Sequence, residues 1–218
     1  RTVHGGERFS EATFVTPAVK AELEACSALA PLHNPVNLLG IEVCERLLPG
    51  VPQVAVFDTA FHLTMPEHAW RYSIPKDVAA RFRVRRYGFH GTSHKFIAER
   101  SAELLGRNDV ATRARNLYVT SGTGILPVSP EQTGKMPVPL PDLRVISCHL
   151  GGSSSITGIR NGVAIGNSMG MSPQSGLPHN NRVGDLDSFA MPYMMRTLGL
   201  SLSLDEVERQ LCRDGLRL

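Results

Sequence analysis

The sequence predicts a soluble globular protein in which helices alternate with short strands. The chain has 218 residues, of which 42% are hydrophobic and 20% are charged, as is typical of folded domains. A chain of this length buries roughly 70% of its unfolded surface, so it needs neither disulfides nor a structural metal to fold. Apolar residues recur at helical spacing in some segments and as short runs in others. We therefore expect one large domain or two small ones.

Four helices are expected, each from a start signal followed by apolar residues at helical spacing. Thr16 and Asn34 each precede a proline, which is favoured in the first turn of a helix. Ser203 and Glu206 have the spacing of a capping box. The expected helices run over 17–30, 34–47, 92–105 and 204–211.

Short apolar runs predict the strands. Residues 54–57 form a run too short for a helix, and Asp58 follows at its carboxyl end. Residues 143–150 predict a second strand. Residues 156–165 predict a hairpin, because Asn161-Gly162 stands between alternating apolar residues.

Residues 107–142 differ from the rest of the chain. They carry repeated Pro and Gly and show neither helical spacing nor a strand long enough to pair well. We expect an exposed, flexible insertion that the fold does not require; a lid or docking arm is the functional alternative. The expected organisation is one region made of 1–106 and 143–218, interrupted by this insertion.

Charge and cysteine content exclude several classes of protein. The net charge of +3 is too small to indicate a nucleic-acid-binding protein. No apolar run approaches the ~18 residues of a membrane span, and no signal peptide is evident. Cys26, Cys44, Cys148 and Cys212 are scattered without a CxxC pair. We expect them to be buried reduced thiols, which fits a cytoplasmic protein.

Two familiar catalytic patterns are missing. His90 and His94 are four residues apart at a helix start, but no third zinc ligand follows at a suitable spacing. No GxSxG motif frames a nucleophilic serine. We expect neither a protein-held metal centre nor serine-hydrolase activity.

Six clusters of polar residues stand beside glycines or at the ends of expected strands. Arginine forks match phosphate oxygens, Gly/Ser turns let backbone N–H groups approach an anion, and a strand-end carboxylate can hold Mg²⁺ through water. These residue types together favour phosphoryl transfer, in which a site aligns the reactants and neutralises charge. The clusters are centred on Arg1, His33, Asp58, His90, His149 and Arg182.

Each cluster also has a structural alternative. Asp58 with Thr59 is typical of a capped turn, and residues 151–155 are typical of a plain β-turn. The segment 151–155 matches neither GxxxxGK[ST] nor GxGxxG. A histidine within a strand, such as His149, is often a hydrogen-bonded core residue. Residue types and spacing leave these alternatives open.

Six motifs give the sequence a specific resemblance to a known family. They are VHGGERF, APLHNPVNLLGIE, PQVAVFDTAFHLTMP, RRYGFHGTSHKF, VISCHLGGSSSI and NRVGDLD. In order and nearly in spacing they resemble the acetate kinase family (acetate/propionate kinases), over nearly all of the chain outside 107–142. The resemblance implies the α/β fold of the superfamily of sugar kinases, heat-shock chaperone ATPases and actin. It further implies a ribonuclease H-like core, a cleft between two domains and a homodimer.

The resemblance also implies a reaction and the residues that carry it. The reaction is reversible transfer of the γ-phosphoryl of ATP to acetate, which gives acetyl phosphate and ADP with Mg²⁺ as cofactor. Arg1 and Arg182 resemble the arginines that hold acetate and the migrating phosphoryl. His90 resembles the histidine that stabilises the transition state, with His33 in support. Asp58 resembles the catalytic aspartate that positions acetate or the metal.

The same resemblance implies a small apolar pocket for the acetate methyl group, formed by Val3, Leu32, Phe89 and Pro173. Each extra methylene in such a pocket changes binding by only about 1–3 kcal/mol. We therefore expect a modest preference over propionate, and specificity for propionate is an alternative.

His149, Gly151, Gly152 and Ser153 resemble the phosphate loop of the family, with one departure. The family reads HLGNG, whereas this chain has Gly152 and Ser153 in place of Asn and Gly. The change removes an amide side chain that could meet the nucleotide phosphates.

The ends of the chain also differ from the family pattern. The NxGSSS-type strand pair of the family would precede Arg1, and its adenine-binding part would follow Leu218. We expect both ends to be incomplete and the isolated chain to have little kinase activity. A non-catalytic module that binds a carboxylate or phosphate is the alternative function.

Overall fold

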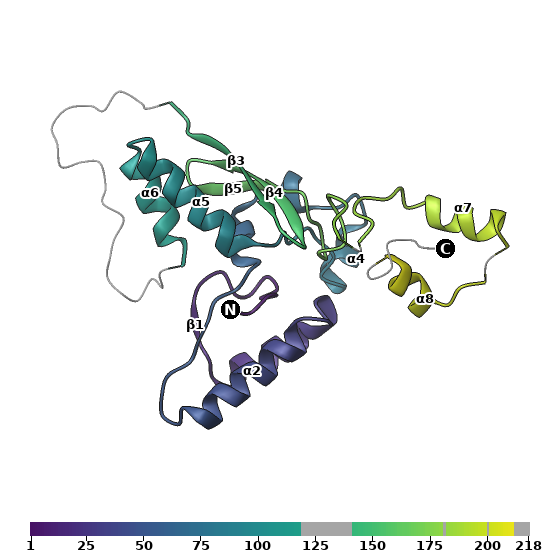
Figure 1. Cartoon of the computed structure of the whole chain (residues 1–218), viewed down its shortest axis with the longest axis horizontal. Coiled ribbons are helices and arrows are strands. Elements are labelled where there is room, and N and C mark those ends of the chain that lie inside the picture. Colours follow the sequence, from purple (N-terminus) through teal and green to yellow (C-terminus); the bar gives the residue numbers. More distant parts are fainter. Residues whose placement is uncertain (119–140, 181, 200, 212–218) are drawn as a thin grey trace.

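An antiparallel sheet of three strands lies at the centre of the computed structural model. Its strands are β3 (Arg144–Leu150), β4 (Ser154–Arg160) and β5 (Val163–Asn167), in that order. Helix α5 (Gly91–Leu104) packs against the sheet, and α6 (Asn108–Arg115) packs against α5 (Figure 1). The structure describes residues 1–118, 141–180, 182–199 and 201–211.

A buried apolar cluster joins the sheet to α5 and to the 3₁₀ helix η2 (Ala60–Thr64). Apolar side chains from both partners lose their contact with water here, which fixes α5 on one face of the sheet. The members of the cluster are Phe61, Met65, Ala98, Ala114, Ile159 and Ala164.

The predicted hairpin is confirmed. Arg160 pairs with Val163, so the loop between β4 and β5 is Asn161-Gly162. Both loop residues have positive φ angles, 49° and 82°. This is the backbone of a type I′ turn, which matches the twist of the strands it joins.

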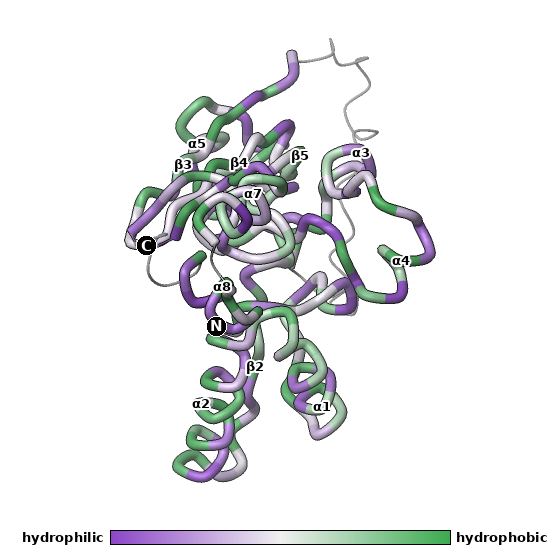
Figure 2. The backbone as a smooth tube through the Cα atoms, turned by 90° about the vertical axis from the view of Figure 1, so that its right-hand side faces the viewer, coloured by the Kyte–Doolittle hydropathy of each residue, from purple (hydrophilic) through white to green (hydrophobic). Residues whose placement is uncertain are grey.

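The N-terminal part carries two helices, as predicted. They are α1 (Pro17–Ala25), followed by η1 (Ser27–Leu29), and α2 (Asn34–Leu47). The hydroxyl of Thr16 accepts a hydrogen bond from the Val19 N–H and caps α1. Figure 2 shows both helices extending away from the body that holds the sheet.

A small two-stranded sheet connects this helical part to the centre. Strand β1 (Thr13–Phe14) pairs with β2 (Val54–Ala55), and beyond β2 an isolated parallel bridge joins Thr2 to Phe57. The N–H of Asp58 donates to the carbonyl oxygen of Thr2 at 3.0 Å. These backbone contacts bring the first residue of the chain beside Asp58.

Further helices complete the described chain. They are α3 (Glu67–Trp70), α4 (Lys76–Arg81), α7 (Ala190–Thr197) and α8 (Leu204–Arg209). The capping box predicted for the last helix is confirmed, because Ser203 and Glu206 exchange both of its hydrogen bonds.

The expectation of irregular structure from residue 107 onward is wrong for the first part of that segment. Residues 108–115 form α6, and η3 (Asn116–Tyr118) follows. Val110, Ala111 and Ala114 are buried, so this part belongs to the packed body. These buried residues are mainly alanines, and their small side chains give only a weak apolar pattern at helical spacing. Residues 119–140 of the expected insertion lie outside the described residues.

The cysteine prediction is partly wrong. Cys26 is buried, whereas Cys44 and Cys148 are exposed; all three are free thiols. Cys212 lies outside the described residues. Within the described residues, no helix combines the length and apolar character that crossing a membrane requires.

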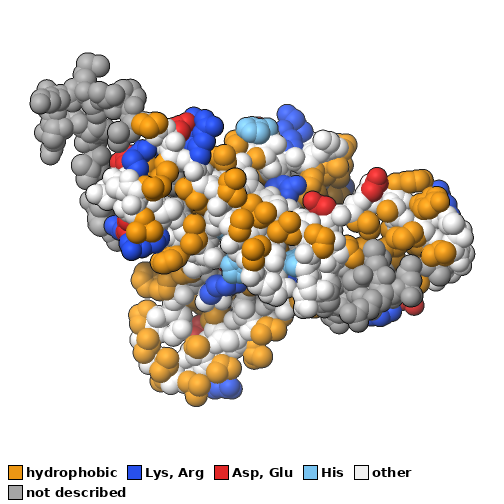
Figure 3. Space-filling view, turned by 45° about the horizontal axis from the view of Figure 1, so that its top comes forward, with side chains coloured by type: hydrophobic (Ala, Val, Ile, Leu, Met, Phe, Trp, Pro, Cys, Tyr) orange, Lys and Arg blue, Asp and Glu red, His pale blue; other side chains and the backbone are white. Residues whose placement is uncertain are grey.

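One face of β3 is uncovered in the described structure. Residues alternate along the strand, so Ser147 and His149 face α5 while Ile146, Cys148 and Leu150 face away. The side chains of Ile146 and Leu150 are 76% and 73% exposed. Further exposed hydrophobic side chains lie on α2, and Figure 3 shows how much of the surface is apolar.

Candidate functional site

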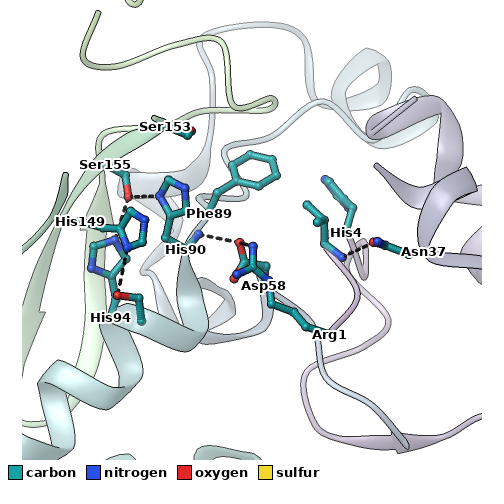
Figure 4. A network of polar contacts seen from close by, with 12 residues as sticks. Arg1, His4, Asn37, Asp58, Phe89, His90, His94, His149, Ser153 and Ser155 are labelled. Atoms are coloured by element: carbon teal, nitrogen blue, oxygen red, sulfur yellow. Dashed lines mark hydrogen bonds and ion pairs between the residues drawn. The ribbon is translucent and has the colours of Figure 1, made fainter. Parts of the chain in front are cut away.

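Asp58 is the centre of a polar site between the N-terminal segment and α5. Its side chain is 2% exposed, and Oδ2 accepts a hydrogen bond from the backbone N–H of His90 at 2.9 Å. The Arg1 guanidinium forms an ion pair with the same oxygen at 3.3 Å. Figure 4 shows Arg1 and His90 approaching the carboxylate from different segments. Three residues far apart in sequence are therefore joined at one oxygen atom.

The backbone around His90 is unusual. His90 has a φ of 58°, in the left-handed region that non-glycine residues rarely adopt. It precedes the first residue of α5, Gly91, whose N–H donates to the carbonyl oxygen of Asp58 at 2.8 Å. A Cβ atom on Gly91 would overlap that carbonyl oxygen. The close approach explains why glycine stands here, and strain of this kind is frequent at functional sites.

Histidine side chains gather beside the carboxylate (Figure 4). The ring of His149 stacks on that of His90, with 4.0 Å between ring centroids. Nδ1 of His149 lies 3.0 Å from the hydroxyl oxygen of Ser93. Nδ1 of His90 lies 2.8 Å from the hydroxyl oxygen of Ser155 on β4. The first turn of α5 therefore holds the ring of His149, and strand β4 holds the ring of His90.

The electrostatic setting keeps His90 neutral. Burial lowers its pKa to about 3, and the neighbouring His149 and His94 act in the same direction. Burial also raises the pKa of Asp58, while the positive charge of Arg1 opposes that rise. A neutral His90 imidazole thus lies beside the ion pair of Arg1 and Asp58.

Arg182 and His33 belong to the same electrostatic neighbourhood. Burial lowers the pKa of His33, and the charges of Arg182 and then Arg1 lower it further, whereas Asp58 raises it. Nη1 of Arg182 donates to the hydroxyl of Ser153 at 2.9 Å. The charges of both arginines and of Asp58 therefore act on His33.

The four residues expected to form the apolar pocket differ in their surroundings. Phe89 is 2% exposed and packs edge-on against the ring of His4, with 5.8 Å between centroids. Pro173 is buried, and its carbonyl oxygen lies 3.5 Å from Nη1 of Arg182. The N–H of Val3 donates to Asn37 of α2 at 2.9 Å, and Leu32 is 44% exposed. Phe89 and Pro173 thus lie against the polar site, while Leu32 opens to solvent.

The expected phosphate loop is a turn between β3 and β4. Gly151 and Gly152 are exposed, and the N–H of Gly151 donates to the carbonyl oxygen of Ser153 at 3.2 Å. A Cβ atom on Gly152 would meet nothing within 4 Å. The turn is therefore open to solvent on the side of Gly152, and Arg182 reaches its other end through Ser153.

Sequence analysis assigned no role to three polar residues that support the site. His94 is 0% exposed and lies within hydrogen-bond distance of both Ser147 and Ser155. His94 lies four residues after His90, the residue that precedes α5, and this spacing brings both rings to the same side of the helix start. Strand alternation places Ser147 and Ser155 on the opposing sheet face, since Ser155 pairs with His149, two residues beyond Ser147.

Mg²⁺ fits this site only together with a ligand that brings its own oxygens. The described residues contain no group of three or more His, Cys, Asp or Glu side chains that could hold a metal ion. Mg²⁺ is commonly bound through one carboxylate, waters and substrate phosphates. Asp58 is the carboxylate available for such an arrangement.

Comparison with known proteins agrees with the order of the motifs. The model of the acetokinase family matches residues 1–133 and 115–217. Acetate kinase of Alkaliphilus metalliredigens is 45% identical over 195 residues, 89% of this chain and 41% of that protein. Acetate kinase of Bacillus subtilis is 44% identical over 199 residues, 91% of this chain and 42% of that protein.

Solved structures give the same result. A Porphyromonas gingivalis acetate kinase superposes with a TM-score of 0.76 at 40% identity, covering 98% of this chain and 45% of that one. A Francisella tularensis propionate kinase superposes with a TM-score of 0.77 at 35% identity, covering 99% of this chain and 47% of that one. The chain thus spans less than half the length of these relatives. Its fold is the expected α/β fold of acetate and propionate kinases, and the chain belongs to the acetokinase family.

Proposed function

We propose that the protein acts in reversible phosphoryl transfer from ATP to acetate, which gives acetyl phosphate and ADP. The observation that carries the proposal is the junction of Arg1 and His90 at one carboxylate oxygen of Asp58. Guanidinium and imidazole donors around a small polar site suit an anion that carries both carboxylate and phosphoryl charge. Membership of the acetokinase family supports this chemistry.

The two arginines supply positive charge where phosphoryl transfer needs it. Arg1 has a side chain that is 54% exposed, so its guanidinium can turn from Asp58 towards a bound carboxylate. Arg182 is held at the turn between β3 and β4, where it donates a hydrogen bond to Ser153. In phosphoryl transfer an arginine that neutralises the developing charge is worth about 10³–10⁵ in rate.

His90 and Asp58 have complementary roles in the proposal. A neutral His90 donates a hydrogen bond to the migrating phosphoryl without adding a full positive charge. Asp58 holds the backbone of His90 and the guanidinium of Arg1 in position. His33 lies within the field of both arginines and supports the charge balance of the bound anion.

The proposed acetate pocket uses excluded volume. Phe89 and Pro173 provide its buried wall, and Val3 and Leu32 provide its outer edge. Because the outer edge is partly open, we propose acetate as the preferred acid and accept propionate as a close competitor.

The proposed nucleotide contacts lie at the turn between β3 and β4. His149, Gly151, Gly152 and Ser153 would face the phosphates of ATP, and the open side of Gly152 leaves room for a phosphate to approach the backbone. Mg²⁺ bound to the nucleotide supplies charge neutralisation, with Asp58 as the nearby carboxylate. Residues 1–106 and 143–218 are proposed to form the kinase-like α/β region that spans the cleft between two domains.

Two further proposals follow from family membership. We propose a homodimer as the working assembly and the cytoplasm as its location. Size-exclusion chromatography with light scattering tests the first, and microscopy of a tagged protein tests the second.

A chimera tests the activity. This chain replaces the matching segment of Bacillus subtilis acetate kinase, and hydroxylamine traps any acetyl phosphate formed from acetate, ATP and Mg²⁺. We expect turnover, and we expect Arg182→Ala to lower kcat at least ~10³-fold. Arg113→Ala, which removes an exposed arginine on α6, is the matched control and should leave kcat unchanged.

Two outcomes would contradict the proposal. An active chimera whose turnover survives Arg182→Ala would show that the phosphoryl group is held elsewhere. A folded chimera without turnover would favour the non-catalytic binding module, and titration of the 218-residue chain with acetyl phosphate would then measure what it binds.

A further inference from the structure

A chain of buried hydrogen bonds runs from the sheet to His90. Nδ1 of His94 lies 2.8 Å from the hydroxyl oxygen of Ser147, and Nε2 of His94 lies 2.8 Å from that of Ser155. The same Ser155 oxygen lies 2.8 Å from Nδ1 of His90. The order is therefore Ser147, His94, Ser155, His90. His94 and Ser155 are 0% exposed and Ser147 is 3% exposed, so water does not interrupt the chain.

The protons of this chain cannot be placed independently. A serine hydroxyl carries one hydrogen, so when that hydrogen lies along the chain Ser155 donates to one imidazole and accepts from the other. A neutral imidazole likewise has one N–H and one acceptor nitrogen. Burial keeps both rings neutral, since it lowers the pKa of His94 to about 4 and that of His90 to about 3. With the serine hydroxyls directed along the chain, two proton arrangements are then possible.

In the first arrangement every hydrogen bond points towards His90. Ser147 donates to Nδ1 of His94, Nε2–H of His94 donates to Ser155, and Ser155 donates to Nδ1 of His90. The proton of His90 is then on Nε2. In the second arrangement every bond is reversed, and Nε2 of His90 is a bare acceptor. Both histidines carry their proton on Nε2 in the first arrangement and on Nδ1 in the second.

The surroundings of His90 favour the first arrangement when an anion binds. Within the described part of the chain, no residue forms a hydrogen bond with Nε2 of His90, so this atom is left for a ligand. The Arg1 guanidinium and the His90 backbone N–H both contact Oδ2 of Asp58, which places the cationic side chain near His90. An anion drawn by Arg1 meets an N–H donor in the first arrangement and a repelling lone pair in the second.

We propose that Ser147, His94 and Ser155 are positioning residues that keep the proton of His90 on Nε2, so that a neutral N–H faces a bound phosphoryl or carboxylate anion. The importance of this proton for turnover rests on the proposed function, whereas its location does not. The proposal gives His94 a role beyond packing, because His94 transmits the direction of the Ser147 hydrogen bond to the site.

Histidine ring NMR tests the proton positions directly. In the 218-residue chain labelled with ¹⁵N-histidine, long-range ¹H–¹⁵N correlations at neutral pH distinguish the two neutral tautomers. His90→Gln and His94→Gln assign the signals. In the presence of acetyl phosphate we expect both rings to carry the proton on Nε2. Protons on Nδ1 of both rings, or different tautomers for the two rings, would overturn the proposal.

Variants separate positioning from general stability. Ser155→Ala should leave His90 as a mixture of tautomers, and Ser155→Thr, which retains a hydroxyl, should restore the Nε2–H form. Thr157→Val is the matched control. It removes a buried hydroxyl on the same face of β4, and this hydroxyl contacts His62 rather than His90. If Ser155→Ala does not fold, Ser147→Ala provides the same test from the far end of the chain. A His90 tautomer unchanged in a folded Ser155→Ala or Ser147→Ala variant would contradict the proposal.

The chimera with Bacillus subtilis acetate kinase separates this inference from the proposed function. We expect Ser155→Ala to lower kcat about tenfold or more while the KM for acetate changes little. An active chimera with the proton of His90 on Nδ1 overturns the inference alone. An inactive chimera with the proton on Nε2 overturns the proposed function alone.

Discussion

Gly91 shows how closely single residues are constrained around the site. Its N–H binds the carbonyl oxygen of Asp58, and His90 before it adopts a left-handed backbone. The side chain of Asp58 in turn accepts the N–H of His90. Any change that separates these backbones moves both the imidazole and the carboxylate.

Gly91→Ala is therefore expected to be damaging, although both residues are small. The added methyl group overlaps a backbone oxygen that cannot move independently of Asp58. We expect a loss of about 3 kcal/mol in the free energy of unfolding, measured by urea denaturation. Gly40→Ala is the matched control within α2, where a Cβ meets nothing within 4 Å. It should stabilise the chain by about 0.5–1 kcal/mol, and equal effects of the two variants would refute the close contact.

Val3→Ala tests the outer edge of the proposed acetate pocket. The shorter side chain makes room for one more methylene, so the ratio of kcat/KM for propionate to that for acetate should rise. A change of about tenfold is the scale expected for one methylene. Competition between the two acids in the hydroxamate assay of the chimera measures the ratio. An unchanged ratio would remove Val3 from the pocket.

At the level of elements, sequence patterns predicted those with strong local signals. The helix starts at Thr16 and Ser203 and the turn at Asn161-Gly162 are specified by residues within a few positions. Asp58 after the short apolar run was identified in the same way. Local chemistry was sufficient for the helix caps and the turn because their hydrogen bonds are local, whereas the partners of Asp58 lie 32 and 57 residues away.

Other elements depend on contacts that spacing does not reveal. The buried face of α6 consists mainly of alanines. These small side chains are recognisable as a core face only once α5 is seen to pack against them. His62 is 0% exposed and contacts Thr157, 95 residues away, which sequence spacing does not reveal. The approach of Arg1 to Asp58 likewise depends on the bridge between Thr2 and Phe57. Motif order led to the predicted site residues, and only the structure showed the network of serines and His94 beside them.

Val110→Ala measures how far α6 contributes to the packed body. Val110 is 3% exposed and packs with Ala102 and Ala111. Loss of two buried methyl groups should lower the free energy of unfolding by about 2 kcal/mol. Arg113→Ala, on the exposed side of the same helix, should have little effect. If both variants were equally stable, α6 would not contribute to the packed body.

The whole molecule should lose stability in mild acid because it buries neutral histidines. Burial lowers the pKa of His4 and of His94 to about 4 and that of His90 to about 3. In the unfolded chain these groups take up protons below about pH 6.5. The unfolded state thus binds more protons than the native state between about pH 6.5 and 4. The free energy of unfolding therefore decreases as the pH is lowered through that range.

Each such histidine contributes a slope of about 1.4 kcal/mol per pH unit within the window. Asp58 acts in the opposite direction, because burial raises its pKa and the native carboxyl gains a proton before the unfolded one. Urea titrations between pH 7.5 and 4.5 measure the net slope. His94→Asn should flatten it, whereas His68→Gln, at an exposed position, should not. A free energy of unfolding that is constant across this range would contradict the prediction.

The alternation along β3 also provides a way to watch the uncovered sheet face. Cys148 presents a free thiol there, while its neighbours Ser147 and His149 face the opposite way. With Cys44 and Cys212 replaced by serine, a fluorescent maleimide on Cys148 becomes a covalent reporter. Its fluorescence emission would change if another molecule bound to that face. The label would not contact the imidazoles on the opposite side of the sheet.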